Sequence, residues 1–427
     1  MSPKARKRQK TKDTLSIEVD YPSEKHRMLA NWAIKRGIEV NNVKPAELPG
    51  RGIGLVATKS IKEGQRIIFV PEKAMIKPDP DALNHVVHRS INKEESPQAH
   101  LTATLMLEAL KGSESDWYEI CQSVWPQQGD FDVCMLCSED HQLNPLFEDV
   151  IPPSIKAPLD RLFKDLESDL GSARISIESK YERDNEFVPH QSDRFKASGL
   201  YHWMIANTRS FHWKPTGRKE GAMVICPYLD YMNHCPEGKG CKVTQSDKGY
   251  ELTANRNYES GEEILAAYGA HPNDKLLVHY GFVLPSEANS DDEIRLDHVI
   301  LPRLSQAQQD MLRDVGYLGG YGLIPVDNDI CFKTQVAVRS VLLTSNEWEH
   351  YMGSGEDLAS NKDAEVKRWL EPSMQQYLQE VNEGVRRLRV KKHNHQGALH
   401  SKLDLLERRW VQIRDAVQAY LDDGAGG

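Results

Sequence analysis

The chain has 427 residues and a formal net charge of −9 at pH 7, with 39% hydrophobic and 27% charged residues. This balance is typical of a globular protein with a buried core, and its acidity excludes a protein whose whole surface binds nucleic acid. A membrane-spanning helix is excluded as well, because no run of about 18 apolar residues occurs. The seven cysteines show no regular disulfide spacing, so we expect an intracellular protein with free thiols, in two or three domains.

The N-terminal segment 1–20 is predicted to be a basic, disordered tail. Its basic residues lie between Lys4 and Lys12, and the apolar stretch of a secretory signal is missing. Short basic runs are typical either of solvated tails or of nuclear-import and nucleic-acid-contacting segments. Both alternatives stay open, and we expect residence in the cytoplasm, the nucleus or both.

A helix, two strands and a helical stretch are predicted next. Apolar residues at helical spacing predict a helix over 24–36, which Gly37 ends. The apolar runs 55–57 and 67–70 flank a turn at Gly64 and predict a pair of strands. From about residue 82 to 205 the apolar spacing is helical again. The two clearest apolar faces consist of Leu101, Leu105, Leu107 and Leu110, and of Leu159, Leu162, Phe163 and Leu166.

Strands return after this stretch and precede a helical C-terminal region. The runs 223–225, 250–253 and 262–265 predict strands, and the polar run 289–292 predicts a hinge. The last segment carries an apolar stripe at spacings of three and four residues, which favours packing against a neighbouring helix. The stripe consists of Leu399, Leu403, Leu406, Trp410, Ile413, Val417 and Tyr420.

The predicted fold class is therefore α+β. A β core of short strands is split by a helical insertion and followed by an all-helical C-terminal domain. The predicted boundaries are 1–20 for the tail, 21–90 and 206–288 for the two parts of the core, 91–205 for the insertion and 289–427 for the C-terminal domain.

Two segments contain residues suited to ligand binding, although each has a structural alternative. Gly52 and Gly54 let the backbone approach a ligand closely, because no Cβ intervenes, or they form a tight turn. Arg209 follows the predicted insertion and can grip a carboxylate with its planar guanidinium, or it pairs with a surface acid.

Two further segments contain polar or aromatic residues in apolar surroundings. Asp230, Asn233 and His234 interrupt an apolar stretch, and buried polar groups must find hydrogen-bond partners. They form either a structural network or a ligand site. The dipeptide Tyr-Gly occurs at Tyr268 and again at Tyr280, and the two rings either wall a narrow channel or fill a core.

In this order, the segments resemble the SET-domain protein methyltransferases, in particular the Rubisco methyltransferase-like branch. The resemblance covers nearly the whole chain after the tail. It rests on the helix with Trp32, the turn 51–55, the insertion segments 117–120 and 125–126, the Asp-x-x-Asn-His run 230–234, Tyr-Gly at 268 and Tyr-Gly-Phe at 280–282. In that branch a helical insertion splits the SET core, and a helical substrate-binding domain follows it.

The resemblance implies transfer of a methyl group from S-adenosylmethionine to a protein side chain, usually a lysine. The substrate implied is a non-histone protein, such as a ribosomal or translation protein. The cofactor contacts that the resemblance implies are made by the backbone of Arg51, Gly52 and Ile53, by Asn233 and His234 at the adenine end, by Phe282 in the same pocket, and by Arg209 at the cofactor carboxylate or the target side chain.

The resemblance also implies a target-lysine channel walled by Asp230, Tyr280 and Phe211, with Tyr268 as the catalytic tyrosine. A lysine must lose a proton before it can attack a methyl group, and its ordinary pKa is about 10.4. A desolvated channel beside a cationic sulfonium would lower that pKa, because both effects disfavour a second charge. The channel residues then act mainly by positioning the amine.

The sequence departs from the family pattern at a few positions. Arg51 stands where many relatives carry Glu, and Cys235-Pro236 follows Asn-His in place of Ser-Cys. No cysteine cluster follows the second tyrosine, so we expect no metal, and the helical C-terminal domain would have to cover the channel. Cys134 and Cys137 have a metal-like spacing without a second pair, which favours ordinary free thiols.

Other interpretations remain open at this point. One alternative is that the methylated side chain is a histidine instead of a lysine. Another is that the chain is a non-catalytic binding module with a SET fold. The basic run 386–392 is either a solvated helix face or a docking patch for an acidic partner. We expect a monomer that binds a protein substrate and makes no direct contact with nucleic acid.

Overall fold

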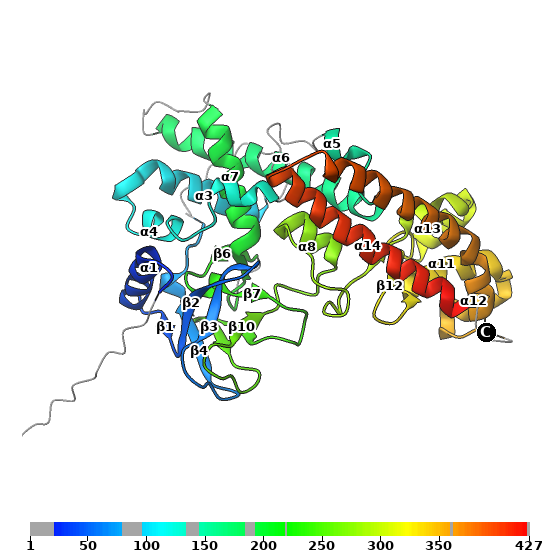
Figure 1. Ribbon diagram of the computed structural model, residues 1–427, viewed down its shortest axis with the longest axis horizontal. Coiled ribbons are helices and arrows are strands. Elements are labelled where there is room, and N and C mark those ends of the chain that lie inside the picture. Colours follow the sequence, from blue (N-terminus) through cyan, green and yellow to red (C-terminus); the bar gives the residue numbers. More distant parts are fainter. Residues whose placement is uncertain are drawn as a thin grey trace, which may run out of the picture.

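The computed structural model describes residues 21–78, 96–133, 145–183, 193–217, 220–358 and 362–424. The basic tail and the pair Cys134 and Cys137 lie outside these ranges. Figure 1 shows a β-rich core, helices of the insertion on one side of it, and an elongated C-terminal region. No helix within the described ranges is long and apolar enough to cross a membrane.

Two four-stranded sheets form the core. The first has the order β1-β4-β9-β8 and the second the order β2-β3-β10-β7, and all neighbours are antiparallel except β10 and β7. The strand bounds are β1 (Glu39–Val40), β2 (Val43–Leu48), β3 (Gly52–Ala57), β4 (Arg66–Pro71), β7 (Asn233–His234), β8 (Lys242–Ser246), β9 (Gly249–Thr253) and β10 (Glu263–Ala266). Helix α1 (Glu24–Lys35) precedes them and ends before Gly37, as expected.

The strands predicted at 55–57 and 67–70 are confirmed as β3 and β4, but they do not pair with each other. They belong to different sheets, because the connection 58–65 is longer than the loops that close tight hairpins. Within this connection Ile61 is buried and bridges to Tyr258, which anchors the crossing in the core.

The insertion is helical, as predicted. It contains α3 (Pro97–Lys111), η2 (Gly112–Glu114), α4 (Tyr118–Gln122), η3 (Gln128–Val133), α5 (Pro145–Glu148), α6 (Pro153–Arg183) and α7 (Asp193–Arg209), and the short helix η1 (Glu72–Ala74) precedes it in the core. Ser96 caps α3 by accepting hydrogen bonds from the backbone N–H groups of Gln98 and Ala99. The apolar face predicted around Leu159 in α6 is buried or half-buried throughout.

The apolar face predicted in α3 is only half correct. Leu101 and Leu105 are fully buried in the main core, whereas Leu107 belongs to a small separate cluster and Leu110 is 46% exposed. The physical reason is the helical period: residues 107 and 110 lie on a different side of the helix from residues 101 and 105.

The chain returns to the core through the hairpin β5 (Ser210–Trp213) and β6 (Ala222–Ile225). The short helix η4 (Leu229–Tyr231) then leads into β7, and helix α8 (Asn273–Tyr280) follows β10. Two of the four segments singled out in the sequence therefore meet in strands β3 and β7 of the second sheet, Tyr268 follows β10 of the same sheet, and Arg209 and Tyr280 end helices α7 and α8.

The C-terminal region is mainly helical, with one addition that the sequence did not predict. It contains α9 (Asp297–Ile300), η5 (Leu301–Arg303), α10 (Gln306–Asp314), α11 (Phe332–Leu342), α12 (Ser345–Ser354), α13 (Asp363–His393) and α14 (Ala398–Gly424). The addition is a small antiparallel sheet of β11 (Ile294–Arg295), β12 (Gly322–Ile324) and β13 (Asp329–Ile330). Its strands are two or three residues long, too short to give an alternating sequence pattern.

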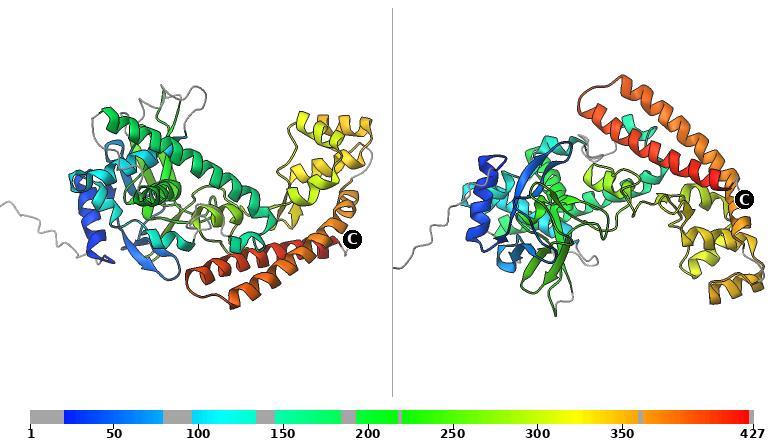
Figure 2. Two further views of the ribbon diagram at one scale, coloured as in Figure 1. Left: turned by 90° about the horizontal axis from the view of Figure 1, so that it is seen from above. Right: turned by 60° about the horizontal axis from the view of Figure 1, so that its bottom comes forward.

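The predicted apolar stripe of the last segment packs against a neighbouring helix, as expected. Helices α13 and α14 form a long antiparallel pair (Figure 2), and six of the seven stripe residues are buried. The close approach of α13 to α14 depends on Gly384, because a Cβ at this position would lie 2.7 Å from the Trp410 ring. The Trp410 indole also donates a hydrogen bond to the carbonyl of Val150, which joins the pair to the insertion.

The basic run 386–392 is largely neutralised within the fold. Arg389 and Lys392 pair with Glu407 of α14, and Lys391 pairs with Asp149 of the insertion. Arg386 pairs with Glu383 one turn earlier. These contacts favour the interpretation as an ion-paired helix face over that of a docking patch.

Candidate functional site

The glycine-containing turn lies against the Asn-His strand. Strand β10 is paired with β3 on one side and with β7 on the other, so residues far apart in the sequence meet across it. At Gly54 a Cβ would lie 2.7 Å from the side-chain amide of Asn233 and 2.6 Å from Leu48. A glycine is therefore needed at position 54 for β3 to approach Asn233.

Glu263 connects this turn to Asn233 and was missed in the sequence. Its carboxylate forms an ion pair with Arg51 and accepts a hydrogen bond of 2.9 Å from the amide of Asn233. The same amide also faces the carbonyl of Arg51, 3.5 Å away. The sequence feature that could have identified Glu263 is the pair Glu262-Glu263 before an apolar run. Only the strand register shows which of the two carboxylates faces Asn233.

His234 is buried and neutral. It is 5% exposed, and burial followed by the nearby His271 lowers its pKa to about 4. The backbone N–H of Tyr268 donates to its Nδ1 at 3.1 Å, which requires that this nitrogen carry no proton. The other nitrogen, Nε2, is a buried donor that has no partner within the described residues.

Three aromatic rings, those of Tyr268, Tyr280 and Phe282, form a group with His234. The ring of Tyr268 lies 5.0 Å from that of His234 and 5.2 Å from that of Tyr280, measured between centroids. Phe282 lies 6.1 Å from His234 and 6.3 Å from Tyr280. The structure therefore brings together the three aromatic residues that were assigned to the cofactor pocket, the channel and catalysis.

Tyr268 is held at both its backbone and its hydroxyl group. The hydroxyl donates a hydrogen bond of 2.6 Å to the carbonyl of Met232, and desolvation raises the pKa of this phenol above its ordinary value. The residue as a whole is 37% exposed, so its ring remains reachable from outside. At neutral pH the side chain is a neutral phenol with free acceptor capacity on its oxygen.

Arg209 and Asp230 form a second, adjoining unit. Arg209 ends α7, and one of its terminal nitrogens donates to the backbone carbonyl of Asp230 at 3.0 Å and lies 3.4 Å from the carboxylate. Burial raises the pKa of Asp230, and the charge of Arg209 opposes that rise. Tyr228, two residues earlier, directly precedes η4 and has a φ of +72°, a conformation that costs a non-glycine residue energy.

Phe211 is not part of the aromatic group among the described residues. It lies in β5, half-buried, and its ring faces Tyr250 at 5.4 Å. It is linked to the site through Arg209, two residues earlier in the chain. The channel role predicted for Phe211 stays a prediction.

The structure adds two contributors that sequence reasoning missed. His271 stacks between His234, 6.4 Å away, and Tyr280, 6.2 Å away. Asn207 forms two hydrogen bonds with His279, at 3.1 Å and 3.2 Å, and so joins α7 to α8. Neither pair shows a recognisable spacing in the sequence, because the contacts depend on how the helices dock.

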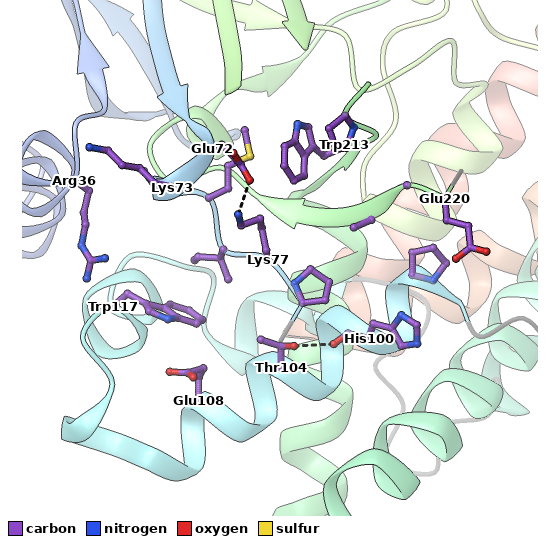
Figure 3. A pocket seen from close by; sticks show the side chains of 18 of the residues that line it. Arg36, Glu72, Lys73, Lys77, His100, Thr104, Glu108, Trp117, Trp213 and Glu220 are labelled. Atoms are coloured by element: carbon purple, nitrogen blue, oxygen red, sulfur yellow. Dashed lines mark hydrogen bonds and ion pairs between the residues drawn. The ribbon is translucent and has the colours of Figure 1, made fainter. Parts of the chain in front are cut away.

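A separate cavity of about 860 Å³ lies between α1, α3 and the β5–β6 hairpin. Figure 3 shows Trp117 and Trp213 on opposite walls and Lys77 paired with Glu72 between them. The residues lining this cavity include none of the site residues predicted from the sequence. Within the described ranges, no group of three or more His, Cys, Asp or Glu side chains is arranged to hold a metal ion.

Comparison with known proteins gives the family. The family model of the SET domain matches residues 52–269, half of the chain, and the chain belongs to the SET-domain family. This match includes the insertion and the core strands from β3 to β10, and it begins after β1 and β2.

Individual relatives are more distant. SET domain-containing protein 4 of Homo sapiens is 28% identical over 265 residues, which cover 60% of this chain and 57% of that protein. The ribosomal lysine N-methyltransferase set11 of Schizosaccharomyces pombe is 31% identical over 39% of this chain and 41% of its own length. The SET domain of LSMT bound to lysine and AdoHcy has the same fold, with a TM-score of 0.63 over 94% of this chain and 91% of that one, at 15% identity.

Proposed function

We propose that this protein is an S-adenosylmethionine-dependent protein-lysine N-methyltransferase. The observation that carries the proposal is the meeting of Tyr268, His234 and Tyr280 at one place, beside the Arg209–Asp230 unit and the glycine turn. A protein that only kept the fold would have no chemical need for these groups together. The proposed substrate is a non-histone protein such as a ribosomal or translation protein, an assignment supported by the name of the fission yeast relative.

The residues present fit S-adenosylmethionine. His234 presents a buried Nε2 without a partner among the described residues, Phe282 offers an aromatic face, and the backbone at Gly52 is open, because a Cβ added there would meet no described atom within 4 Å. The Arg209 guanidinium has a further buried nitrogen, Nε, without a partner among the described residues, and its positive charge suits a carboxylate. The backbone of residues 51–53 and the amide of Asn233 would complete the pocket.

When bound, S-adenosylmethionine supplies a methyl group on a positively charged sulfur. The chain's own residues must then deliver a neutral amine to it. Tyr268 and Tyr280 form an aromatic, partly desolvated passage that disfavours a charged ammonium and so lowers the pKa of an entering lysine. The lysine gives up its proton to solvent before its nitrogen lone pair forms the bond to carbon and the sulfur–carbon bond breaks.

Tyr268 acts in this scheme as a positioning acceptor and not as a base. Its phenol is neutral at pH 7, because the ordinary pKa of a tyrosine is about 10 and desolvation raises the pKa further, and its proton is used in the hydrogen bond to the carbonyl of Met232. The oxygen can still accept an N–H of the amine and thereby orient the nitrogen lone pair toward the methyl group. Orientation of this kind accounts for several orders of magnitude in rate.

The variant Tyr268→Phe tests the catalytic assignment. We expect methyl transfer to fall at least about 100-fold, because the orienting oxygen is lost, while S-adenosylmethionine still binds. Lysate protein incubated with labelled cofactor and either wild type or variant, followed by mass spectrometry of the modified residue, gives the result. Wild-type turnover in the variant would contradict the assignment, and label on histidine would establish the histidine alternative.

Two further features belong to the same proposal. We infer a monomer that acts on a protein partner in the cytoplasm, the nucleus or both, with no requirement for a metal. Absence of both cofactor binding and methyl transfer in the wild type would favour a non-catalytic binding module instead.

A further inference from the structure

A buried polar network joins the C-terminal helix α14 to the segment that carries Tyr280 and Phe282. Its centre is Arg409, which is fully buried in α14. The Nε of Arg409 donates to Asp274 at 2.6 Å, and one terminal nitrogen donates to Asp292 at 2.7 Å. Both carboxylates are buried as well, with 4% and 1% of their side chains exposed.

The two aspartates lie at opposite ends of one stretch of chain. Asp274 is in the first turn of α8, and Asp292 follows the loop that leaves Phe282. Tyr280 is six residues after Asp274, about 9 Å along the helix axis. A single guanidinium therefore holds both ends of the segment that forms two walls of the candidate site.

Neutral side chains reinforce the same junction. The amide of Gln412, one turn after Arg409, donates to the carbonyl of Leu284 at 2.7 Å and accepts from the amide of Asn273 at 3.2 Å. The carboxylate of Asp292 also accepts from the backbone N–H of Asn273 at 2.8 Å. These bonds connect α14 to the start of α8 and to the chain immediately after Phe282.

The polar run 289–292 therefore has a different role from the hinge that its composition predicts. Asn289 and Asp292 are almost completely buried. Asn289 donates to the side-chain oxygen of Asn273 at 3.0 Å and to the backbone of His271 at 3.2 Å. A segment fixed by so many buried hydrogen bonds is a rigid connection, because opening it would leave several polar groups unsatisfied.

We propose that Arg409 is a positioning residue for methyl transfer, which sets the location of Tyr280 and Phe282 by clamping both ends of the segment 274–292 to helix α14. The C-terminal helical pair is then part of the catalytic unit in addition to any contact it makes with a substrate. The effect on catalysis rests on the proposed methyltransferase function, whereas the effect on the position of α8 does not.

The variants Arg409→Lys and Arg409→Met test the proposal in the full chain. Lysine keeps the charge but cannot bridge two carboxylates with a planar fork, and methionine removes the charge. Two controls come from the same helix: Arg408→Gln alters a neighbouring arginine that is 64% exposed, and Val417→Ala weakens the helical pair away from α8. Gln412→Met, a milder change at the same junction, replaces the Arg409 variants if neither of them folds.

Hydrogen–deuterium exchange of the cofactor-free protein is the first measurement. We expect the amides of residues 276–282 to exchange at least about tenfold faster in the Arg409 variants than in Arg408→Gln or Val417→Ala. The second measurement is the ratio of mono-, di- and trimethylated product, which we expect to change because Tyr280 walls the channel. The ratio is compared at equal total methylation, because a lower amount of folded enzyme then leaves it unchanged.

The possible results separate the two proposals. Exchange in α8 that matches the Val417→Ala control would overturn the clamp, as would an unchanged product ratio together with unchanged turnover. In another outcome, the wild type transfers no methyl group while the Arg409 variants still show faster exchange in α8. That result would support the clamp and overturn the proposed function.

Discussion

Asn233 owes its orientation to a carboxylate that no simple motif identifies. Glu263 binds its amide and pairs with Arg51, so the glycine turn and the Asn-His strand share one acceptor. The neighbouring Glu262 instead pairs with Arg256 at the surface. Two adjacent glutamates therefore have different roles, because Glu263 is the first residue of β10 and faces Asn233, whereas Glu262 precedes the strand.

This difference gives a prediction for a matched pair of variants. We expect Glu263→Ala to weaken S-adenosylmethionine binding at least about tenfold, because Asn233 and Arg51 lose a largely buried partner. We expect Glu262→Ala to bind like wild type, since its pair is exposed and contributes little. Titration calorimetry measures both. Equal affinities in the two variants would show that Glu263 does not orient the pocket.

At the scale of elements, close helix packing depends on one small residue. Gly384 of α13 faces the Trp410 ring of α14, and a Cβ would lie 2.7 Å from it. The pair also carries Arg409, so its packing bears on the site as well as on stability. An exposed glycine in another long helix, Gly171 of α6, provides a comparison, because a Cβ added there would meet no atom within 4 Å.

We expect the two glycines to respond to alanine in opposite directions. Gly384→Ala should lower the free energy of unfolding by about 1–2 kcal/mol, because overpacking outweighs the gain in helix propensity. Gly171→Ala should raise it by up to about 1 kcal/mol, since only the propensity changes. Urea denaturation of both variants checks this. Stabilisation by both substitutions would mean that α13 and α14 are not in close contact at Gly384.

How far the sequence predicts these elements depends on their length and pattern. The stripe from Leu399 to Tyr420 spans many helical turns, so its burial could be predicted from spacing alone. The small sheet around β12 has no such pattern. The four site segments could be assigned to one pocket only through the family resemblance, because their contacts cross between strands β3, β7 and β10 and helix α8. His271 and Glu263 could not be found that way, since neither belongs to a motif.

At the scale of the whole molecule, buried histidines couple stability to pH. Burial lowers the pKa of His202 in α7 from 6.5 to about 4, and His234 is shifted to a similar value. The neutral form of His202 is fully satisfied: its Nδ1 donates to the carbonyl of Ser198 at 2.6 Å, and its Nε2 accepts from the hydroxyl of Tyr118 at 2.6 Å. Protonation would place a hydrogen on Nε2, so the Tyr118 hydroxyl would have to accept instead of donate, and a charged ring would be buried.

The sign of the pH effect follows from these shifts. Between pH 6.5 and about 4 the unfolded chain binds more protons than the folded one, so stability is lost as pH falls through that window. Between pH 7 and 5, the titration of His202 alone should lower the free energy of unfolding by roughly 2 kcal/mol. Between pH 7 and 5 we expect the free energy of unfolding, measured by urea denaturation, to fall by about 2 kcal/mol less in His202→Gln than in wild type. An equal decrease in the free energy of unfolding in variant and wild type would contradict the conclusion that His202 is buried in its neutral form.

The fold also explains why distant parts of the chain act together. Helix α14 ends the described chain, yet Arg409 reaches the aspartates on either side of Tyr280 and Phe282. The core match that defines the family stops at residue 269, before α8 begins. The walls contributed by α8 therefore depend on contacts outside the segment that the family model covers.

The central claim is that these segments form one pocket for S-adenosylmethionine, and calorimetric titration of the full chain with that compound tests it most directly. The account predicts a single saturable binding event in the wild type, with near one-to-one stoichiometry, that persists in Tyr268→Phe and weakens at least about tenfold in Glu263→Ala. A wild-type protein that shows no saturable binding would contradict it.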